Sequence, residues 1–271
     1  MSVEQMCSIT KISRATYYRQ WLESRPLEAD TEIREQLQTL ALQDRHCGYR
    51  RLTRKLNNDG VVVNHKRVLR IMREDNLLCL RKKAFVPVTT DSKHSWKTHR
   101  NLARGMQTTA LNQLWVADIT YIRLREEFVF AAVVLDAHSR RVIGWAVEPN
   151  IGAMLAIKAL QMASASRQPE PGMIHHSDRG IQYACADYVK LLDDAGIQPS
   201  MSRAGNPYDN AKAESFMKTL KKEEVNGRIY QDLSELRERL GEFFEATYNQ
   251  SRLHSALGYL SPNHFEKAIQ S

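Results

Sequence analysis

The sequence has few cysteines and no long apolar run. Its four cysteines (Cys7, Cys47, Cys79 and Cys185) are scattered, and none stands in a CxxC pair. Neither a disulfide framework nor a cysteine zinc site is therefore expected. No apolar stretch approaches the ~18 residues of a membrane helix, and the amino terminus lacks the basic and apolar segments of a secretory signal. We expect a cytoplasmic protein with reduced thiols and no membrane partner.

Excess positive charge is absent from the last three-fifths of the chain. The 271 residues include 39 Lys and Arg and 31 Asp and Glu, a net charge of +8. Residues 1–110 carry 21 basic against 11 acidic residues, whereas residues 111–271 carry 18 against 20. This asymmetry favours an N-terminal region that binds nucleic acid (the front part) joined to a chemically different C-terminal region (the back part). A solvated basic surface is the alternative.

The basic front part is predicted to be all-helical. Residues 1–25 have the length and polarity of a short helix-turn-helix segment. In residues 26–80, helices are predicted over 31–43, up to about Asn58, and over 65–75. The last two form a second helix-turn-helix, with 65–75 as its recognition helix. The alternative is that two short basic helices simply pack together.

Five basic residues of this region are candidates for DNA contact. They are Lys66, Arg67 and Arg70 on the predicted recognition helix, and Arg50 and Arg51 on the helix before it. Lysine and arginine are the residues that neutralise DNA phosphates. Residues 81–110 are polar and basic with few apolar anchors, which predicts a linker.

From residue 111 the hydrophobic period becomes two, which is typical of strands. The expected strands cover about 113–124, 128–136, 141–147, 173–178 and 197–201. The expected helices cover about 152–166, 184–195, 209–225 and 232–248. The order βββαβαβα fits a mixed five-stranded sheet with helices on its faces, as in the ribonuclease H fold. The predicted fold class is α/β (α+β), with a ribonuclease H-like core at 111–226, a helical tail at 227–271 and an all-α front region.

Three carboxylates stand at informative positions of this core. Asp118 lies inside the first, otherwise apolar strand, where an acid needs a specific reason to be. Asp178 follows the fourth strand, and Glu214 lies one turn into the helix after a loop. Strands one and four are expected to be neighbours, so the three acids could converge. Taken singly, Asp178 could be a turn residue and Glu214 a solvated helix charge.

Such a cluster needs a counter-charge, and a pair of divalent metal ions would supply it. Hard oxygen ligands favour Mg²⁺ or Mn²⁺. Lys218 and Lys221 stand four and seven residues after Glu214, on the same helix face. They could hold DNA phosphates beside the metal site. An ordinary pairing of Glu214 with Lys218 would explain that spacing equally well.

The spacing of the three acids, and the residues around them, resemble those of a known family. Fifty-nine residues separate Asp118 from Asp178, and thirty-five separate Asp178 from Glu214. This resembles the DDE signature of retroviral-type integrases and bacterial transposases. The surrounding segments 115–121, 176–180, 205–210, 214–216 and 248–259, together with 48–68, resemble the orfB transposase of the IS-three family of insertion sequences. Lys221 falls where that family carries a basic residue.

The resemblance implies an activity and partners. The family's enzymes cut at terminal inverted repeats to free a 3′ hydroxyl, which attacks the other end and leads to a circular intermediate that later integrates. The working enzyme is commonly a frameshifted fusion of orfA and orfB, so this chain would be the orfB portion. The resemblance implies DNA as substrate (terminal inverted repeats and target), a homo-oligomer on DNA, and a bacterial, nucleoid-associated protein.

Several histidines and aromatic residues are less informative. His94 and His99 have no matching CxxC, so no zinc site is expected. His175 and His176 are either strand-end residues or contacts of phosphate or of the acids. His254 could contact DNA or pack the helical tail. Trp115 and Tyr121 are expected in the core or on the sheet face.

Two rival functions remain at this stage. One is a DNA-binding regulator whose catalytic domain is inactive without the orfA partner. The other is a ribonuclease H-fold nuclease that hydrolyses DNA but does not join it. The intact acids argue against the first, and the basic helical front part and the 35-residue spacing argue against the second.

Overall fold

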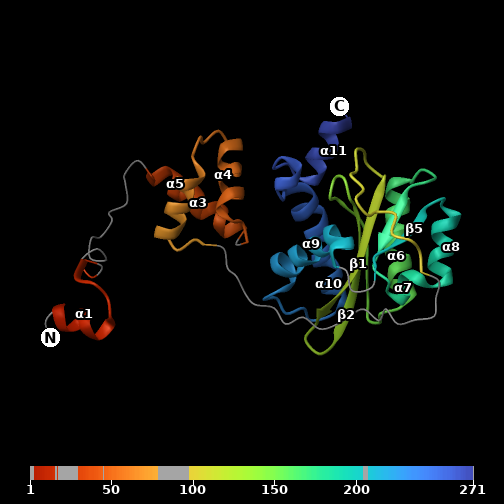
Figure 1. Ribbon diagram of the computed structural model, residues 1–271, viewed down its shortest axis with the longest axis horizontal. Helices are drawn as coiled ribbons and strands as arrows, with labels where there is room; N and C mark the ends of the chain where they lie inside the picture. Colours follow the sequence, from red (N-terminus) through yellow and green to blue (C-terminus); the bar gives the residue numbers. More distant parts are fainter. Residues whose placement is uncertain are drawn as a thin grey trace. The chain divides into compact units, whose positions relative to one another are not determined.

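The computed structural model describes residues 3–15, 17, 30–44, 46–78, 98–203 and 207–270. The chain divides into two compact units, Met1–Arg81 and Lys82–Ser271 (Figure 1). The predicted linker at 81–110 lies largely outside the described residues, as do His94, Cys79 and residues 18–25. Each unit is described separately below.

The first unit is helical. It contains α1 (Val3–Thr10), α3 (Thr31–Gln43), α4 (Tyr49–Asn58) and α5 (His65–Glu74). The Asn64 side chain caps α5 by accepting a hydrogen bond from the backbone N–H of Lys66. The core between α3, α4 and α5 is apolar and consists of Ile33, Leu37, Cys47, Leu52, Leu56, Val63, Val68, Ile71 and Met72. These three helices lie where the hydrophobic periodicity predicts them.

The second unit is built on a mixed five-stranded sheet. Its strands are β1 (Leu114–Arg123), β2 (Phe128–Asp136), β3 (Val142–Glu148), β4 (Ile174–Ser177) and β5 (Gln198–Met201). The order is β3-β2-β1-β4-β5. The first three strands form an antiparallel meander, and β4 and β5 run parallel to β1. The predicted pairing of the first and fourth strands is thus confirmed, and with it the α/β fold class.

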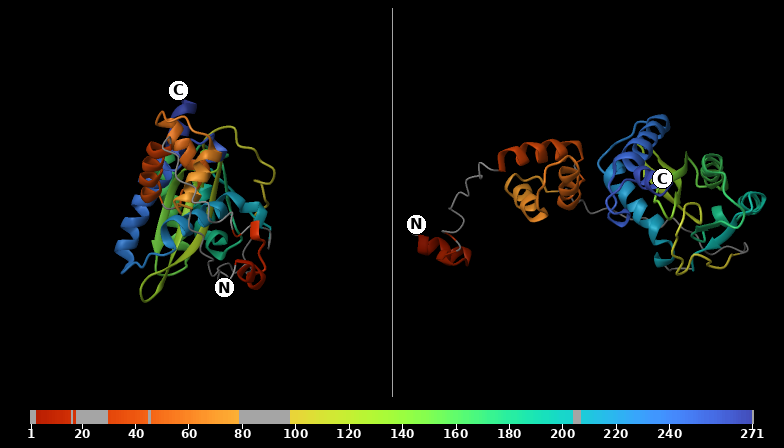
Figure 2. Two further views of the ribbon diagram at one scale, coloured as in Figure 1. Left: turned by 90° about the vertical axis from the view of Figure 1, so that its left-hand side faces the viewer. Right: turned by 90° about the horizontal axis from the view of Figure 1, so that it is seen from above.

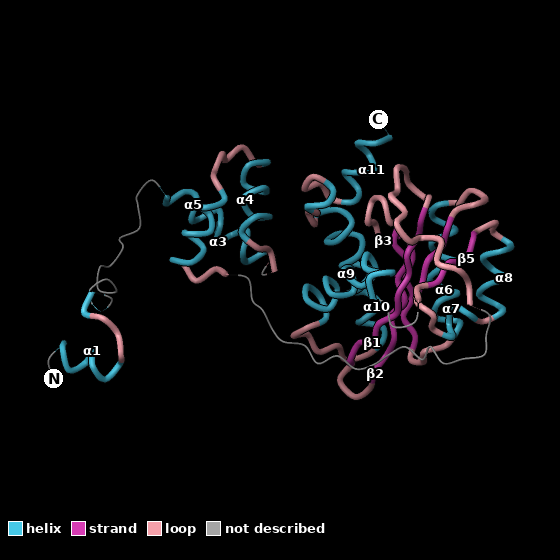
Figure 3. Tube along the Cα trace, viewed as in Figure 1, coloured by secondary structure: helices cyan, strands magenta, loops and turns pink. Residues whose placement is uncertain are grey.

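Helices cover both faces of the sheet (Figures 1 and 3). One face carries α6 (Ala153–Arg167), α7 (Ile181–Ala184) and α8 (Ala186–Asp194). The other carries α9 (Ala211–Leu220), α10 (Leu233–Glu242) and the π-helical segment η4 (Phe243–Ser251). The right-hand view of Figure 2, in which the molecule is seen from above, shows the blue helices on one side of the strands and the green and teal helices on the other. Each face has its own apolar core.

Three of the predicted helices are not uniformly α-helical. The helix expected at 184–195 begins earlier and breaks at the extended residue Cys185. The break lets Tyr183 and Tyr188 both reach the ring of His175. The helix expected at 209–225 is η2 (Pro207–Asn210), α9 and the π-helical segment η3 (Lys221–Val225). The helix expected at 232–248 is α10 continued by η4.

The tail ends in η5 (Ser255–Leu257) and α11 (Pro262–Gln270). Ion pairs hold this region to the core. Glu223 of η3 accepts two hydrogen bonds from the Arg252 guanidinium, at 2.8 and 3.0 Å. Glu266 of α11 is 4% exposed and accepts hydrogen bonds from Ser139, Arg141 and Arg167.

Gly144 of β3 marks the closest approach between the sheet and α6. A Cβ atom at this position would lie 2.2 Å from the Ala159 carbonyl oxygen and 2.6 Å from the Ala163 backbone nitrogen. Because both neighbours are backbone atoms, the helix would have to move. We expect Gly144→Ala to lower the free energy of unfolding by about 3 kcal/mol, measured by urea denaturation. Gly152→Ala, where a Cβ meets nothing within 4 Å, is the control.

Candidate active site

Asp118 lies in the middle of β1, on the face covered by α9. Side chains alternate along a strand, and Leu114, Val116 and Ile122 share a core with α9 residues. Trp115 and Ala117 share the opposite core with α6. The even-numbered position of Asp118 therefore directs its carboxylate to the α9 face. Its Oδ1 accepts a hydrogen bond from the Ile119 backbone N–H at 2.8 Å.

Asp178 reaches the same face from the neighbouring strand. In the parallel pairing of β1 with β4, Val116 lies opposite His176. Continuing this register by two residues sets Asp178, just after β4, beside Asp118. Asp178 Oδ1 accepts a hydrogen bond from the Gly180 backbone N–H at 2.9 Å. A Cβ atom at Gly180 would lie 3.0 Å from that oxygen, so the missing side chain makes room for the carboxylate.

Two contacts fix α9 along β1 and thereby place Glu214. Before the helix, Asn210 Nδ2 donates a hydrogen bond to the Ala117 carbonyl oxygen at 2.9 Å. After the helix, the Lys221 ammonium lies over the Tyr121 ring, 4.2 Å from its centroid. Glu214, one turn into α9, lies between these two anchors. The structure thus brings the three predicted acids to one region of the sheet.

The electrostatics of the site reflect this convergence. Burial, together with the negative charges of Asp178 and Glu214, raises the pKa of Asp118 to about 7. The Lys221 ammonium opposes this rise. Half-burial lowers the pKa of Lys221, and the charge of Asp118 partly offsets that effect. Because two acids raise the pKa of a third, the negative charges of this cluster are not balanced by nearby positive charge.

The two lysines after Glu214 differ. Lys218 has an 80% exposed side chain, and its ammonium lies 3.7 Å from a Glu214 carboxylate oxygen. That is the ordinary helical pairing, which contributes little to stability. Lys221 is half-buried, contacts Tyr121 and interacts with Asp118. Of the two, Lys221 is the one placed to act at the acids.

The donor set fits a hard divalent cation bound with few protein ligands. Among the described residues, no group of three or more His, Cys, Asp or Glu side chains is arranged to hold a metal ion. Mg²⁺ usually takes one or two carboxylates and fills its shell with water and substrate phosphate oxygens. Asp178 and Glu214 both interact electrostatically with Asp118, so carboxylates of this kind lie near one another. In addition, Asn210 Oδ1 is buried beside β1 and has no hydrogen-bond partner among the described residues.

The DNA-contact candidates of the first unit fall into two groups. Arg67 and Arg70 are paired with the fully buried Asp30, at 2.7 and 2.6 Å. These ion pairs join α5 to the residue before α3, while the Arg67 and Arg70 side chains remain 39% and 40% exposed. Lys66 is exposed at the start of α5, and Arg50 is exposed at the start of α4, where it stacks on Tyr49. Arg51 donates a hydrogen bond to the His46 carbonyl oxygen at 2.8 Å.

The histidines of the core are packing residues. His176 contacts Ser200 Oγ at 2.8 Å and Ser202 Oγ at 3.1 Å, and burial lowers its pKa to about 4. His175 contacts the Tyr188 hydroxyl at 3.0 Å, and burial lowers its pKa to about 3. His254 is buried against Tyr248, with ring centroids 5.0 Å apart. These contacts support the strand-end alternative for His175 and His176 and the packing alternative for His254.

The aromatic pair behaves as expected. Trp115 is fully buried, and its Nε1 donates a hydrogen bond to Asn112. Tyr121 lies on the sheet beneath Lys221.

Asn210 lies near the acids and is not among the candidate residues predicted from the sequence. The available signal is an amide side chain directly before the helix that carries Glu214, a position typical of helix caps.

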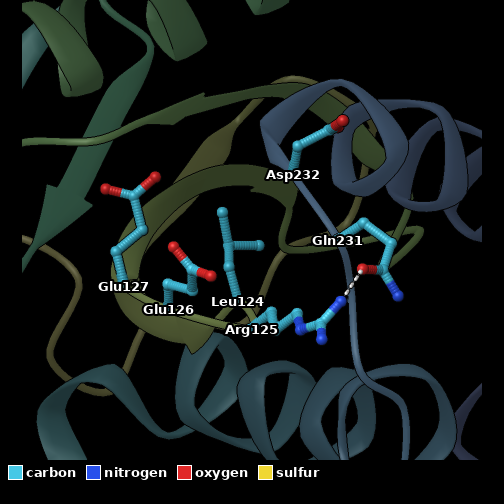
Figure 4. A pocket seen from close by; sticks show the side chains of 6 residues that line it. All are labelled: Leu124, Arg125, Glu126, Glu127, Gln231 and Asp232. Carbon is cyan, nitrogen blue, oxygen red and sulfur yellow. Dashed lines mark hydrogen bonds between the residues drawn. The ribbon is translucent and has the colours of Figure 1, made fainter.

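A hollow elsewhere on the second unit does not belong to this site. It lies at the β1–β2 turn and before α10 (Figure 4), and its lining residues are Leu124, Arg125, Glu126, Glu127, Gln231 and Asp232. Arg125 donates a hydrogen bond to Gln231 across it, at 3.3 Å. Leu124 directly follows β1 and is six residues beyond Asp118. The hollow is therefore at the end of the strand, away from the acids.

Comparison with known proteins identifies the parts of the chain. Residues 108–207 and 195–262 match the family description "Integrase core domain", and residues 28–85 match "HTH-like domain". "Transposase InsF for insertion sequence IS3A" of Escherichia coli (strain K12) is 34% identical over 271 residues, covering 98% of this chain and 94% of that protein. The transposase for insertion sequence element IS904 of Lactococcus lactis is 37% identical over 223 residues, covering 80% and 86%.

A further relative covers almost the full length. It is the "Insertion element IS600 uncharacterized 31 kDa protein" of Shigella sonnei, 36% identical over 267 residues, which is 97% of each chain. Solved structures are more distant. The HTLV-2 integrase catalytic core domain in complex with magnesium is 14% identical with a TM-score of 0.44, covering 59% of this chain and 99% of that one. Within the described residues, no helix has the length and apolar character needed to span a membrane.

Proposed function

This chain belongs to the IS-three family of insertion-sequence transposases, and on that premise we propose that Asp118, Asp178 and Glu214 are its catalytic residues. The protein acts in DNA transposition and recombination, as a polynucleotidyl transferase with an integrase core. The observation that carries the proposal is the position of the three acids. They stand on β1, after β4 and on α9, and two of them raise the pKa of the third.

The same three acids are proposed to bind two divalent ions, either Mg²⁺ or Mn²⁺. When bound, such ions activate the attacking oxygen and stabilise the leaving 3′ oxygen during phosphoryl transfer. The chain's own residues position the reactants. Asp118 is fixed by the Ile119 N–H, and Asp178 by the Gly180 N–H. Lys221, held over Tyr121, is placed to pair with a phosphate of the DNA end.

Recognition of DNA is proposed to start in the first unit. The HTH-like region and its exposed Lys66 and Arg50 support contact with phosphates. Arg51, Arg67 and Arg70 are proposed as further contacts, although an ion pair or a backbone hydrogen bond already engages each of them, whereas Lys66 and Arg50 are the exposed ones. We further propose a homo-oligomer on paired ends, an orfA partner that supplies part of the end recognition, and action on bacterial nucleoid DNA.

The test is a joining assay. The purified chain is incubated with a labelled duplex carrying the two ends of its element, with Mg²⁺, Mn²⁺ or EDTA. Metal-dependent cleavage followed by strand joining supports the proposal, whereas cleavage without joining indicates a nuclease. Binding without chemistry leads to the same assay on the orfA fusion. Joining by the fusion restores the proposal, and its continued absence supports the regulator.

The domain organisation leads to a separate prediction. We propose that residues 1–80 bind DNA and that 111–226 with the tail 227–271 form an independent catalytic body. The cores of the two units share no residue, which supports this. Deleting residues 1–80 is therefore expected to abolish end binding while leaving a cooperatively melting core, measured by circular dichroism. An unfolded fragment would show that the boundary is wrong.

A further inference from the structure

Asn210 has an unusual set of contacts for a residue at the start of a helix. It stands at the N-cap position of α9, where an asparagine side chain normally accepts a hydrogen bond from the helix backbone. Here no such bond forms. Instead, Nδ2 donates to the carbonyl oxygen of Ala117, the residue before Asp118, at 2.9 Å. The side chain has thus exchanged a local cap for a tertiary contact beside the acids.

The contact does not serve stability well. Asn210 is 6% exposed, and its Oδ1 is buried without a hydrogen-bond partner among the described residues. A buried acceptor left unpaired costs as much as a hydrogen bond contributes, or more. The residue also forgoes the favourable capping bond. What the contact supplies is geometry, because it fixes the first turn of α9 on the β1 peptide group that leads into Asp118.

That geometry determines where Glu214 lies. Glu214 follows Asn210 by four residues, so it lies in the first turn of α9, and the contact that fixes the start of the helix also fixes that turn. We propose that Asn210 is a positioning residue, which locks the start of α9 to β1 and so sets Glu214 against Asp118 for metal binding. This rests on the proposed function, since it needs Asp118 and Glu214 to be metal ligands.

The structure offers a matched control. Asn249 in η4 is also a buried asparagine bound to a strand backbone: its Oδ1 accepts from Val142 N–H and its Nδ2 donates to Val142 O, both at 2.9 Å. Both of its polar atoms are paired, and β3 carries none of the three acids. Replacing Asn249 removes a structural contact of the same kind without touching the proposed site.

The experiment measures Mn²⁺ binding by calorimetry on the full chain without DNA. Asn210→Ala and Asn210→Leu are expected to weaken binding about 10–100-fold, the usual effect of losing a residue that orients metal ligands. Leucine fills the volume of the side chain, so a cavity cannot be the cause. Asn249→Ala is expected to lower the melting temperature but to leave Mn²⁺ affinity unchanged. In cleavage assays, raising Mn²⁺ should rescue the Asn210 variants.

Asp118→Asn separates the possible failures. If Asp118→Asn abolishes Mn²⁺ binding while both Asn210 variants bind normally, the positioning role is wrong and the proposed catalytic site stands. If Asp118→Asn binds Mn²⁺ as tightly as the wild type, the proposed site itself fails. Loss of the fold in both Asn210 variants, seen by circular dichroism, would show a structural role and overturn the inference.

Discussion

Asp118→Asn is expected to reduce strand cleavage about 10³-fold or more. The substitution keeps the shape of the side chain and removes the charge that a divalent ion requires. A catalytic metal supplies several kcal/mol of transition-state stabilisation, and each 1.36 kcal/mol is a factor of ten in rate. Asp178→Asn and Glu214→Gln are expected to behave alike, because the acids act as one unit and their effects are not additive.

The comparison needs a readout of DNA binding alongside cleavage. All three variants should bind a duplex end nearly as the wild type does, since DNA is proposed to be held mainly by basic residues. Asp193→Asn, which changes an exposed acid on α8, should cleave normally. Robust cleavage by any one of the three acid variants would remove that residue from the proposed site.

Glu266→Ala is expected to cause the largest loss of stability among the single substitutions considered. The Glu266 carboxylate is buried and accepts hydrogen bonds from Ser139 at 2.6 Å, Arg141 at 2.9 Å and Arg167 at 2.5 Å. Removing it leaves the Arg167 guanidinium, 11% exposed, without its partner. Breaking a buried pair in this way costs about 3–5 kcal/mol. Urea denaturation should show the loss, and Glu245→Ala, an exposed change, should stay within about 0.5 kcal/mol.

The pH dependence gives a second check on Glu266. Burial alone would raise its pKa, but hydrogen bonds from Arg167, Ser139 and Arg141 hold the pKa of Glu266 below its ordinary value. A carboxyl whose pKa is depressed by folding stabilises the protein above its unfolded pKa. That contribution disappears as the pH falls through the folded pKa. The difference between wild type and Glu266→Ala should therefore be largest near neutral pH and shrink below about pH 4. A constant difference would contradict this account.

Strand periodicity and the positions of the acids could be predicted from the sequence. The second strand was expected at 128–136 and is observed there, because alternating and continuous apolar runs leave little choice of register. Asp118 was identifiable because an acid inside an apolar strand needs a reason. The pairing of strands one and four followed from the order of elements.

Tertiary contacts explain what the sequence did not reveal. The ion pairs of Arg67 and Arg70 with Asp30, some forty positions earlier, could not be predicted, whereas their role as DNA contacts stays a prediction. Asn210 stands at the N-cap position of α9, yet its side chain donates to the Ala117 carbonyl oxygen. The break at Cys185 has no local breaker residue and arises where two tyrosines pack around one histidine. Each depends on a partner that local pattern does not specify.

The π-helical segment η3 also determines which changes of chain length the protein can tolerate. It continues α9 without a break and carries Glu223, whose bidentate partner is Arg252. Removing Lys221 or Lys222 would turn Glu223 by roughly a quarter of a turn around the helix axis. Glu223 would then leave Arg252, although each remaining residue would still favour a helix. Within 211–225, substitutions are therefore expected to destabilise the protein less than deletions. Natural length variation should concentrate in the exposed turn at 226–229.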